Sequence, residues 1–340
     1  MKKELLIGIQ EAGVMNTVWN EFDLDTRFRM VKEAGVFDYY DKTPTPYDAP
    51  QFRRAVEKHG LPLTAGGWFY MLGRDEPLLQ WHLQVAREYG TRVQNVQIFT
   101  NNLQGRPVSD REVAETYLWA REIGEKWGVM PCLEVHVNMW SEHFGRVERV
   151  ANLVKRHGVD FNMTLDHSHV IFKMDNPEEQ EVQQMRADVE SGRLELDPFK
   201  DGNVCQRWID ANYVRHAHAR AAVPNGPRNV WAMVDGKPGR GIQYPFIQTK
   251  PGEWHTEWDA EKLEPWKEVI RQLLRHHATD PGSKLATIST EFIPWPDYGA
   301  GAKYSLFEHS IACAEWIRSE WKLAQRAAEL DVSSQSRRVS

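Results

Sequence analysis

The stretch Glu125-Lys126-Trp127-Gly128-Val129-Met130-Pro131-Cys132-Leu133-Glu134-Val135-His136-Val137-Asn138 contains the two features that decide the fold. Its first part is typical of a helix that ends in a glycine. Its second part, from Leu133 to Val137, alternates apolar and polar residues with a period of two, which predicts a strand. Glu134 and His136 would project from the same side of that strand. Because a carboxylate and an imidazole on an enclosed face need partners, the strand also predicts a site.

The same succession of helix, glycine and short strand recurs through the first half of the chain. The glycines are Gly35, Gly60, Gly90, Gly128 and Gly158. Strands that alternate with helices predict a parallel sheet with helical crossovers. We predict eight strands, at residues 5–9, 36–40, 61–65, 93–98, 133–137, 161–166, 213–220 and 285–292. Eight such units predict an α/β fold of the (β/α)8 TIM barrel type, with its site at the C-terminal ends of the strands.

The alternative architecture is a doubly wound open sheet, which would favour a glycine-rich phosphate-binding turn after the first strand. Residues 10–14, Gln-Glu-Ala-Gly-Val, are not such a turn. We therefore predict a single barrel domain over residues 1–330, followed by a flexible polar tail at 331–340. Residues 224–256 are rich in glycine and proline and too long for a simple connection, so we expect a lid or binding loop after strand seven. Residues 176–195 predict one polar helix.

Composition excludes several classes of function. The chain has 340 residues, 41% hydrophobic and 26% charged, with a net charge of −6, which is typical of a soluble globular protein. The negative charge argues against nucleic acid as a partner. No stretch approaches the roughly 18 apolar residues of a membrane span, and the three cysteines are isolated. We therefore expect a cytoplasmic protein with no membrane partner.

Side chains that can bind a metal or move a proton recur at the ends of the last four predicted strands. They are Glu134 and His136 on strand five, Asp166 and His169 after strand six, His216 and His218 on strand seven, and Glu291 on strand eight. A barrel brings these strand ends to one mouth. Three carboxylates and an imidazole form a ligand set for a divalent metal, and its oxygen-rich character favours Mn2+ or Mg2+, with Co2+ and Zn2+ as alternatives. A single histidine at a strand end is more often structural, so the joint occurrence carries this prediction.

This series of residues resembles the xylose isomerase-like TIM barrel superfamily, which includes ketose 3-epimerases of the D-tagatose 3-epimerase type. Those enzymes carry Asp-x-x-His on strand six, as in Asp166-His167-Ser168-His169, and His-x-His on strand seven, with the second histidine on the metal. The resemblance implies that the metal ligands are Glu134, Asp166, His218 and Glu291. It makes His216 a residue behind the ligands, although spacing alone leaves the choice between His216 and His218 open.

Two positions depart from the ketose epimerase pattern. Trp140 stands where those enzymes have a second glutamate, and Pro224 stands where they have an arginine. The pair Glu134 and His136 is more similar to the catalytic alpha subunit of bacterial C-glycoside deglycosidases, in which a metal ligand and a catalytic histidine are side by side. Those enzymes act on 3-oxo-glucosides and require a small beta subunit. This resemblance implies a sugar or glycoside substrate and a hetero-oligomer.

The resemblance to the deglycosidases implies a metal-dependent carbon–carbon lyase. It would enolise a 3-oxo sugar, with His136 as the base, and cleave the C-glycosidic bond by elimination. The alternative is a sugar isomerase or ketose 3-epimerase, in which Glu134 and Glu291 deliver protons to opposite faces of the same enolate. A non-catalytic sugar-binding protein would not explain the ligand set, and an endonuclease IV-like repair enzyme would need more ligands from the early strands. The residues expected to contact the substrate are His169, His216, Arg220, Trp68 and Trp19.

Overall fold

Eight parallel strands close into a barrel in the computed structural model, which describes residues 3–15 and 22–338, with backbone alone at 331–338. The strand order around the ring is β1-β10-β7-β6-β5-β4-β3-β2. The strands are β1 (Leu6–Gln10), β2 (Tyr39–Asp41), β3 (Ala65–Tyr70), β4 (Val93–Ile98), β5 (Met130–Glu134), β6 (Met163–Asp166), β7 (Val214–Ala219) and β10 (Thr287–Thr290). The ring closes where β1 pairs with β10, from Leu6 opposite Thr287 to Ile9 opposite Thr290. The predicted (β/α)8 TIM barrel is confirmed.

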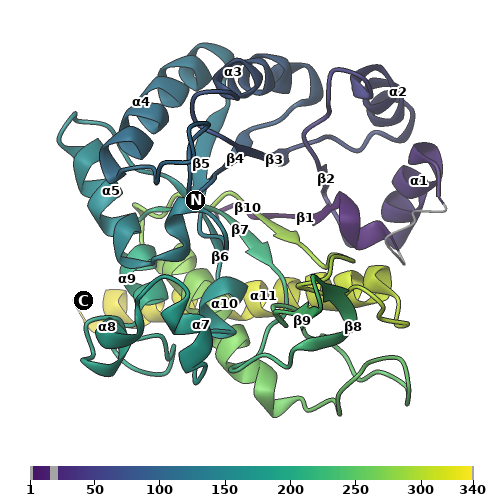
Figure 1. Ribbon diagram of the computed structural model, residues 1–340, viewed down its shortest axis with the longest axis vertical. Coiled ribbons are helices and arrows are strands. Elements are labelled where there is room, and N and C mark those ends of the chain that lie inside the picture. The colour runs from purple at the N-terminus through teal and green to yellow at the C-terminus, as the bar shows by residue number, and fades with distance from the viewer. Residues whose placement is uncertain (1–2, 16–21, 339–340) are drawn as a thin grey trace.

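Helices surround the barrel strands (Figure 1). The larger ones are α1 (Leu24–Ala34), α2 (Ala49–His59), α3 (Glu76–Val85), α4 (Asp110–Trp127), α5 (Gly145–Lys155), α9 (Val204–Asp210), α10 (Glu264–Thr279) and α11 (Leu306–Arg338). Local sequence sets their ends, as α4 illustrates. It begins with a capping box between Ser109 and Glu112 and ends at Gly128, whose φ of 76° is the left-handed conformation that glycine adopts without strain.

The third and fifth strands differ most from their predicted bounds. The third was expected at 61–65, but β3 begins at Ala65, because Leu61 and Leu63 are buried in the connection that precedes it. The apolar residues alternate in this connection as they would in a strand, which explains the wrong bounds. The fifth was expected at 133–137, but β5 ends at Glu134. The Ser141 hydroxyl donates to the backbone carbonyl of Glu134 and accepts from the backbone amide of His136. These two bonds take the place of hydrogen bonds to a neighbouring strand.

The helix expected at 176–195 is two short helices, α7 (Pro177–Glu181) and α8 (Arg186–Glu190). Gln184, between them, has a φ of 56°, which no α-helix accommodates. At the other end of the chain, α11 continues to Arg338, so helix extends into the segment expected to be a tail. None of the helices in the described part of the chain combines the length and apolar character needed to cross a membrane.

The long segment after β7 contains secondary structure of its own. Strands β8 (Asn229–Val234) and β9 (Lys237–Gly239) form an antiparallel hairpin that lies outside the barrel ring (Figure 1). The hairpin contacts the segment that follows β10, where the Asn229 amide donates to the carbonyls of Pro296, Tyr298 and Ala300. The insertion is therefore attached to the loops at the C-terminal end of the barrel.

Candidate functional site

Four side chains from neighbouring strand ends meet at one point. Glu134 ends β5, Asp166 ends β6, His218 lies on β7 and Glu291 directly follows β10. One ligand atom from each lies within 4.8 Å of the other three, and all four residues are buried. Strand register explains part of this convergence, because Asp166 is the partner of His218 across β6 and β7. We call these four residues the carboxylate–histidine cluster.

Two cationic side chains hold the carboxylates of the cluster. His218 Nδ1 lies 2.8 Å from Oε1 of Glu134 and 3.1 Å from Oε2 of Glu291. Arg220 is fully buried, and its Nη2 contacts Asp166 and donates to Oε2 of Glu291 at 2.6 Å. Arg220, which was expected from the sequence to contact substrate, thus binds two of the cluster's carboxylates.

The charges of the cluster depend on one another. Burial opposes the ionisation of Glu134, yet the adjacent His218 lowers the pKa of its carboxyl to about 2. Burial likewise opposes the ionisation of Asp166, and Arg220 keeps its pKa well below the usual value. Burial disfavours a charged His218, but Glu291 and Glu134 raise its pKa well above 6.5. The buried carboxylates are therefore stable as anions only because cations face them.

This donor set fits a divalent cation. It offers carboxylate oxygens and one imidazole nitrogen directed to a common point, which is the hard, oxygen-rich environment that Mn2+ and Mg2+ prefer. Among the described residues, Nε and Nη1 of Arg220 and Nδ1 of His169 are buried without a hydrogen-bond partner. Buried polar atoms of this kind mark a place where a ligand completes the bonding.

Neighbouring polar groups fix the orientation of the ligand oxygens. Asn95, in the middle of β4, donates from Nδ2 to Oε2 of Glu134 at 2.6 Å. Ser168 donates to Oδ1 of Asp166 from its hydroxyl at 2.6 Å and from its backbone amide at 3.1 Å. Such bonds leave the remaining carboxylate oxygens directed toward the centre of the cluster, as in many protein metal sites.

The sequence predicted that Glu134 and His136 share one face of a strand. In the structure His136 lies in the loop after β5, so the two residues do not share a strand face. Its Nδ1 is 2.6 Å from the carbonyl oxygen of Val137. Because a carbonyl only accepts, Nδ1 carries the proton of the neutral ring and Nε2 is free to accept one. The ring packs against that of His169, with centroids 4.3 Å apart. His136 is thus beside the carboxylate–histidine cluster and outside its ligand set.

A deeper group adjoins the cluster and contains Asp41, His216 and His218. His216 Nε2 lies 3.4 Å from Oδ2 of Asp41, and its Nδ1 lies 2.8 Å from the hydroxyl of Thr287. His218 belongs to both groups, since its Nε2 is 3.8 Å from the same Asp41 oxygen. Of the two histidines on β7, His218 therefore faces the three carboxylates and His216 lies behind it.

The other residues expected to contact substrate have different surroundings. His169 Nε2 lies 3.1 Å from Oδ2 of Asp166, at the edge of the cluster. Trp68, on β3, is half-buried, with its ring stacked on Phe69 and the ammonium of Lys42 5.9 Å from its centroid. Trp19 lies outside the described residues.

Tyr298 is a site residue that sequence reasoning missed. It is buried in the segment after β10, with its hydroxyl 3.4 Å from Nε2 of His136 and its ring 4.3 Å from the guanidinium carbon of Arg220. No periodicity or strand end distinguishes this position in the sequence. Asn95 was missed as well, although an asparagine within the apolar pattern of a buried strand could have revealed it.

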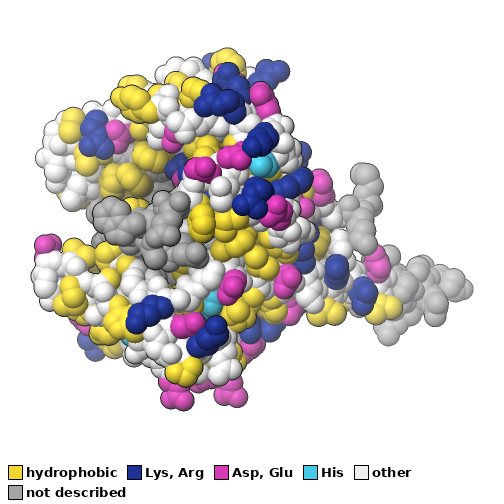
Figure 2. All heavy atoms as spheres, turned by 90° about the vertical axis from the view of Figure 1, so that its right-hand side faces the viewer, with side chains coloured by type: hydrophobic (Ala, Val, Ile, Leu, Met, Phe, Trp, Pro, Cys, Tyr) yellow, Lys and Arg dark blue, Asp and Glu magenta, His cyan; other side chains and the backbone are white. Residues whose placement is uncertain are grey.

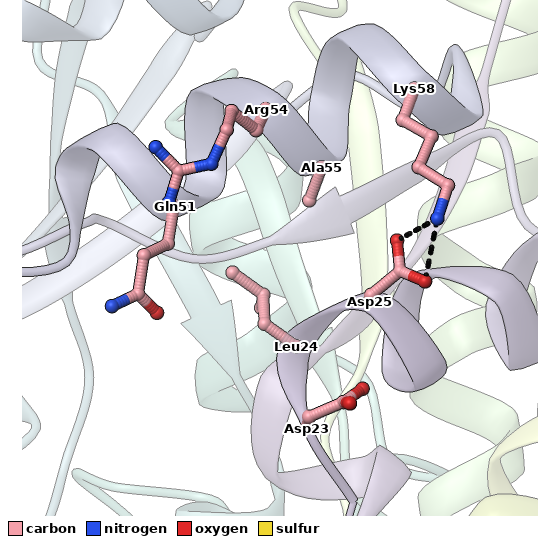
Figure 3. Close-up of a pocket in the computed structure, with 7 residues that line it drawn as sticks. All are labelled: Asp23, Leu24, Asp25, Gln51, Arg54, Ala55 and Lys58. Carbon is pink, nitrogen blue, oxygen red and sulfur yellow. Dashed lines mark hydrogen bonds and ion pairs between the residues drawn. The ribbon is translucent and has the colours of Figure 1, made fainter.

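Two surface features lie away from this site. Figure 3 shows a pocket between α1 and α2, where Lys58 pairs with Asp25 and Asp23 caps the first turn of α1. On the face shown in Figure 2, basic and acidic side chains are interspersed, with hydrophobic side chains between them. Neither feature gathers the converging groups found at the barrel mouth, so we place the function at the carboxylate–histidine cluster.

Comparison with known proteins identifies relatives by structure. No family model and no curated protein sequence matches the chain. D-Psicose 3-epimerase with D-tagatose, from Clostridium cellulolyticum H10, is 15% identical with a TM-score of 0.54, over 93% of this chain and 99% of that chain. IolI with a bound zinc atom is 13% identical with a TM-score of 0.51, over 93% and 99%.

A third solved structure is similar to the same extent. It is a xylose isomerase-like TIM barrel protein from Mycobacterium smegmatis in complex with magnesium, 12% identical with a TM-score of 0.52, over 95% of this chain and 97% of that chain. At these identities the likeness shows a common fold, the (β/α)8 barrel, and no more. The closer resemblance to the C-glycoside deglycosidases stays a prediction.

Proposed function

We propose that this protein is a metal-dependent enzyme that enolises a sugar carrying a ketone. The carboxylate–histidine cluster is the observation that carries the proposal, because it gathers four ligand atoms within 4.8 Å at the mouth of the barrel. Solved structures of the same fold include an epimerase of ketoses, a zinc-bound protein and a magnesium-bound protein, which supports this class of activity. We propose Mn2+ as the metal on the basis of the oxygen-rich donor set.

When bound, a divalent cation supplies Lewis-acid polarisation of the ketone and stabilises the negative charge of the enolate. The residues of the chain bind and orient the sugar and move its proton. His136 presents an unprotonated Nε2, which can take the proton from the carbon next to the ketone. Burial lowers the pKa of His169 to about 3, so its neutral ring can hydrogen-bond a sugar hydroxyl. Nε and Nη1 of Arg220, which have no hydrogen-bond partner among the described residues, offer further donors to the sugar.

The structural neighbours favour an outcome in which the proton returns to the sugar. Glu134 and Glu291 would then exchange protons with opposite faces of the enolate, which converts a ketose into its epimer or isomer. Nothing leaves the substrate in this reaction, and the second of the two glutamates returns a proton to the opposite face.

One contact favours the second candidate, the elimination predicted for a 3-oxo-C-glucoside. The Tyr298 hydroxyl lies 3.4 Å from Nε2 of His136, and burial raises the pKa of Tyr298, so the hydroxyl stays protonated. In this reaction His136 removes the proton next to the ketone, and the electron pair forms a carbon–carbon double bond as the bond to the aglycone breaks. The released aglycone carbon takes up a proton, for which the Tyr298 hydroxyl beside His136 is our candidate donor.

The two outcomes are separated by incubating the purified protein and Mn2+ with a free ketose and, separately, with a 3-oxo-C-glucoside. Epimer formation supports the first candidate and aglycone release supports the second. In either case EDTA abolishes the reaction and Mn2+ restores it. Turnover that EDTA leaves unchanged contradicts the proposed function.

Tyr298→Phe tests whether Tyr298 donates the proton that the released aglycone takes up. It removes the hydroxyl and keeps the ring over Arg220. We expect aglycone release to fall by about 10- to 100-fold while epimerisation is unaffected. Aglycone release at the wild-type rate excludes Tyr298 as the proton donor.

A further inference from the structure

Arg240 joins four segments at the C-terminal end of the barrel. It directly follows β9, at the base of the hairpin insertion. Its guanidinium donates to Oε1 of Glu142 at 2.6 Å, to Oε1 of Glu179 at 3.1 Å and to Oδ1 of Asn138 at 3.4 Å. Its backbone amide donates to Oδ1 of Asp297 at 3.0 Å. One residue of the insertion is therefore bonded to the loops after β5, β6 and β10.

The ion group around Arg240 is buried. Lys173 and Glu142 are almost fully inaccessible, and Lys173 Nζ donates to Oε1 of Glu142 at 3.0 Å and to the carbonyl of Glu179 at 2.8 Å. Burial lowers the pKa of Lys173, whereas its carboxylate neighbours raise it. Buried charges of this kind are costly to desolvate and are satisfied only in good geometry, so they specify one arrangement of the loops.

Each segment held by Arg240 also carries a residue of the site. Asn138 is two residues from His136, and Glu142 holds the Asn138 amide at 2.7 Å. Asp297 is directly followed by Tyr298 in the chain. The His136–Tyr298 contact thus lies between two segments that Arg240 ties together.

The backbone beside Arg240 is shaped for this close approach. A Cβ atom on Gly239 would lie 1.8 Å from the carbonyl oxygen of Pro296, and one on Gly241, whose φ is 80°, would lie 2.2 Å from that of Pro227. Only glycine fits at both positions. Asn229, at the start of β8, adds three hydrogen bonds to the carbonyls around Tyr298.

We infer that the insertion is a clamp, and that Arg240 is the positioning residue through which it sets the geometry between His136 and Tyr298. Arg240 itself does not touch the carboxylate–histidine cluster in any contact of the described residues. The inference goes beyond the proposed function and depends on it only where turnover is measured. A displacement of about 1 Å between reacting groups costs on the order of 100-fold in rate, so loss of the clamp would act on turnover more than on binding.

The test compares Arg240→Gln with Arg228→Gln. Arg228 is the matched control because it belongs to the same insertion and forms a 2.8 Å pair with the exposed Glu178, with Glu179 no nearer than 3.8 Å. Amide hydrogen exchange is measured in segments 136–142 and 295–300 and in the barrel strands, together with Mn2+ affinity, kcat and KM. For R240Q we expect exchange to accelerate more than about tenfold in both segments but not in the strands. We expect kcat for aglycone release to fall about 100-fold while KM and Mn2+ affinity change less than threefold.

Asn229→Ala is an independent variant, for which we expect accelerated exchange in 295–300 and wild-type exchange in 136–142. If R240Q does not fold, Arg240→Lys is measured instead, since it keeps the charge but cannot bridge Glu142 and Glu179 with a planar fork. Wild-type exchange in both segments together with wild-type kcat overturns the inference. Acceleration everywhere with unchanged kcat of the folded protein also overturns it, because it indicates a purely structural role. If the wild type turns over neither sugar, only the proposed function fails, and exchange still decides whether Arg240 positions the loops.

Discussion

His218 Nδ1 lies 2.8 Å from Oε1 of Glu134, although 84 positions separate the two residues in the chain. The same nitrogen lies 3.1 Å from Oε2 of Glu291. One buried imidazole therefore lies between two carboxylates at the mouth of the barrel. This arrangement places the His218 nitrogen and both carboxylates where they would share a bound metal ion.

Loss of a ligand carboxylate weakens metal binding. For Glu291→Gln we expect Mn2+ affinity to fall more than about 100-fold, since removal of residues that merely orient ligands costs 10- to 100-fold. Calorimetric titration of the metal-free protein with Mn2+ measures the change. Glu257→Gln, which changes an exposed glutamate directly after the 224–256 segment, is the control. Wild-type affinity in E291Q would remove Glu291 from the ligand set.

Asn95 is expected to orient a ligand without binding the metal. Its amide holds Oε2 of Glu134 at 2.6 Å, so Asn95→Ala frees that oxygen to rotate. We predict a decrease of about 10- to 100-fold in Mn2+ affinity, smaller than that of E291Q. The same titration checks it, and an unchanged affinity would mean that Glu134 is held by its other contacts alone.

His136 is expected to act on the substrate and to leave the metal unaffected. For His136→Ala we predict a loss of about 100- to 10,000-fold in kcat/KM for aglycone release with unchanged Mn2+ affinity, because a positioned base contributes on that scale and His136 lies outside the ligand cluster. His157→Ala, an exposed histidine that follows α5, is the matched control. Full turnover in H136A would exclude His136 as the base.

The charge of Glu142 makes the stability of the fold depend on pH in the acid range. Burial opposes its charge, but Lys173 and Arg240 lower its pKa from 4.5 to about 2. A lowered carboxyl pKa stabilises the folded state above the unfolded pKa of 4.5, and the contribution is lost as pH falls from about 4.5 to about 2. Glu142→Gln should therefore lower the free energy of unfolding by about 3 kcal/mol at neutral pH.

Urea unfolding of the wild type and E142Q as a function of pH tests this linkage. The difference between them should shrink as pH decreases below about 4.5. A difference that stays constant down to pH 3 would show that the charge of Glu142 does not stabilise the fold.

The barrel was predictable because its signals are local. Each glycine that ends a helix, such as Gly128, has a left-handed conformation that its sequence context indicates. Strand bounds were less predictable, since burial of Leu61 and Leu63 before β3 imitates strand alternation. The glycine-rich start of β3 reflects a tertiary cause, because a Cβ on Gly66 would lie 2.4 Å from the Thr43 hydroxyl.

The candidate ligands were predictable because parallel strands bring equivalent ends together. Glu134, Asp166 and Glu291 could be found by their place at such ends. Tyr298 and Arg240 could not, because they lie in irregular segments whose positions depend on long-range contacts rather than on periodicity. His136 lies outside its predicted strand for a similar reason. The Ser141 hydroxyl, from the following loop, bonds to the carbonyl of Glu134, where β5 ends, and this contact exists only in the folded loop.

The most direct test of the account is solvent deuterium exchange into the sugar. The protein is incubated with Mn2+ in D2O together with a free ketose and, in parallel, a 3-oxo-C-glucoside, and deuterium at the carbon next to the ketone is measured by NMR and mass spectrometry. Because enolisation precedes both epimerisation and elimination, the account predicts deuterium next to the ketone in the ketose epimer, or, for the glucoside, next to the ketone in the recovered substrate and at the released carbon of the aglycone. EDTA abolishes incorporation in either case, and H136A abolishes it for the glucoside. Metal-independent incorporation, or epimerisation of the ketose without incorporation, would contradict it.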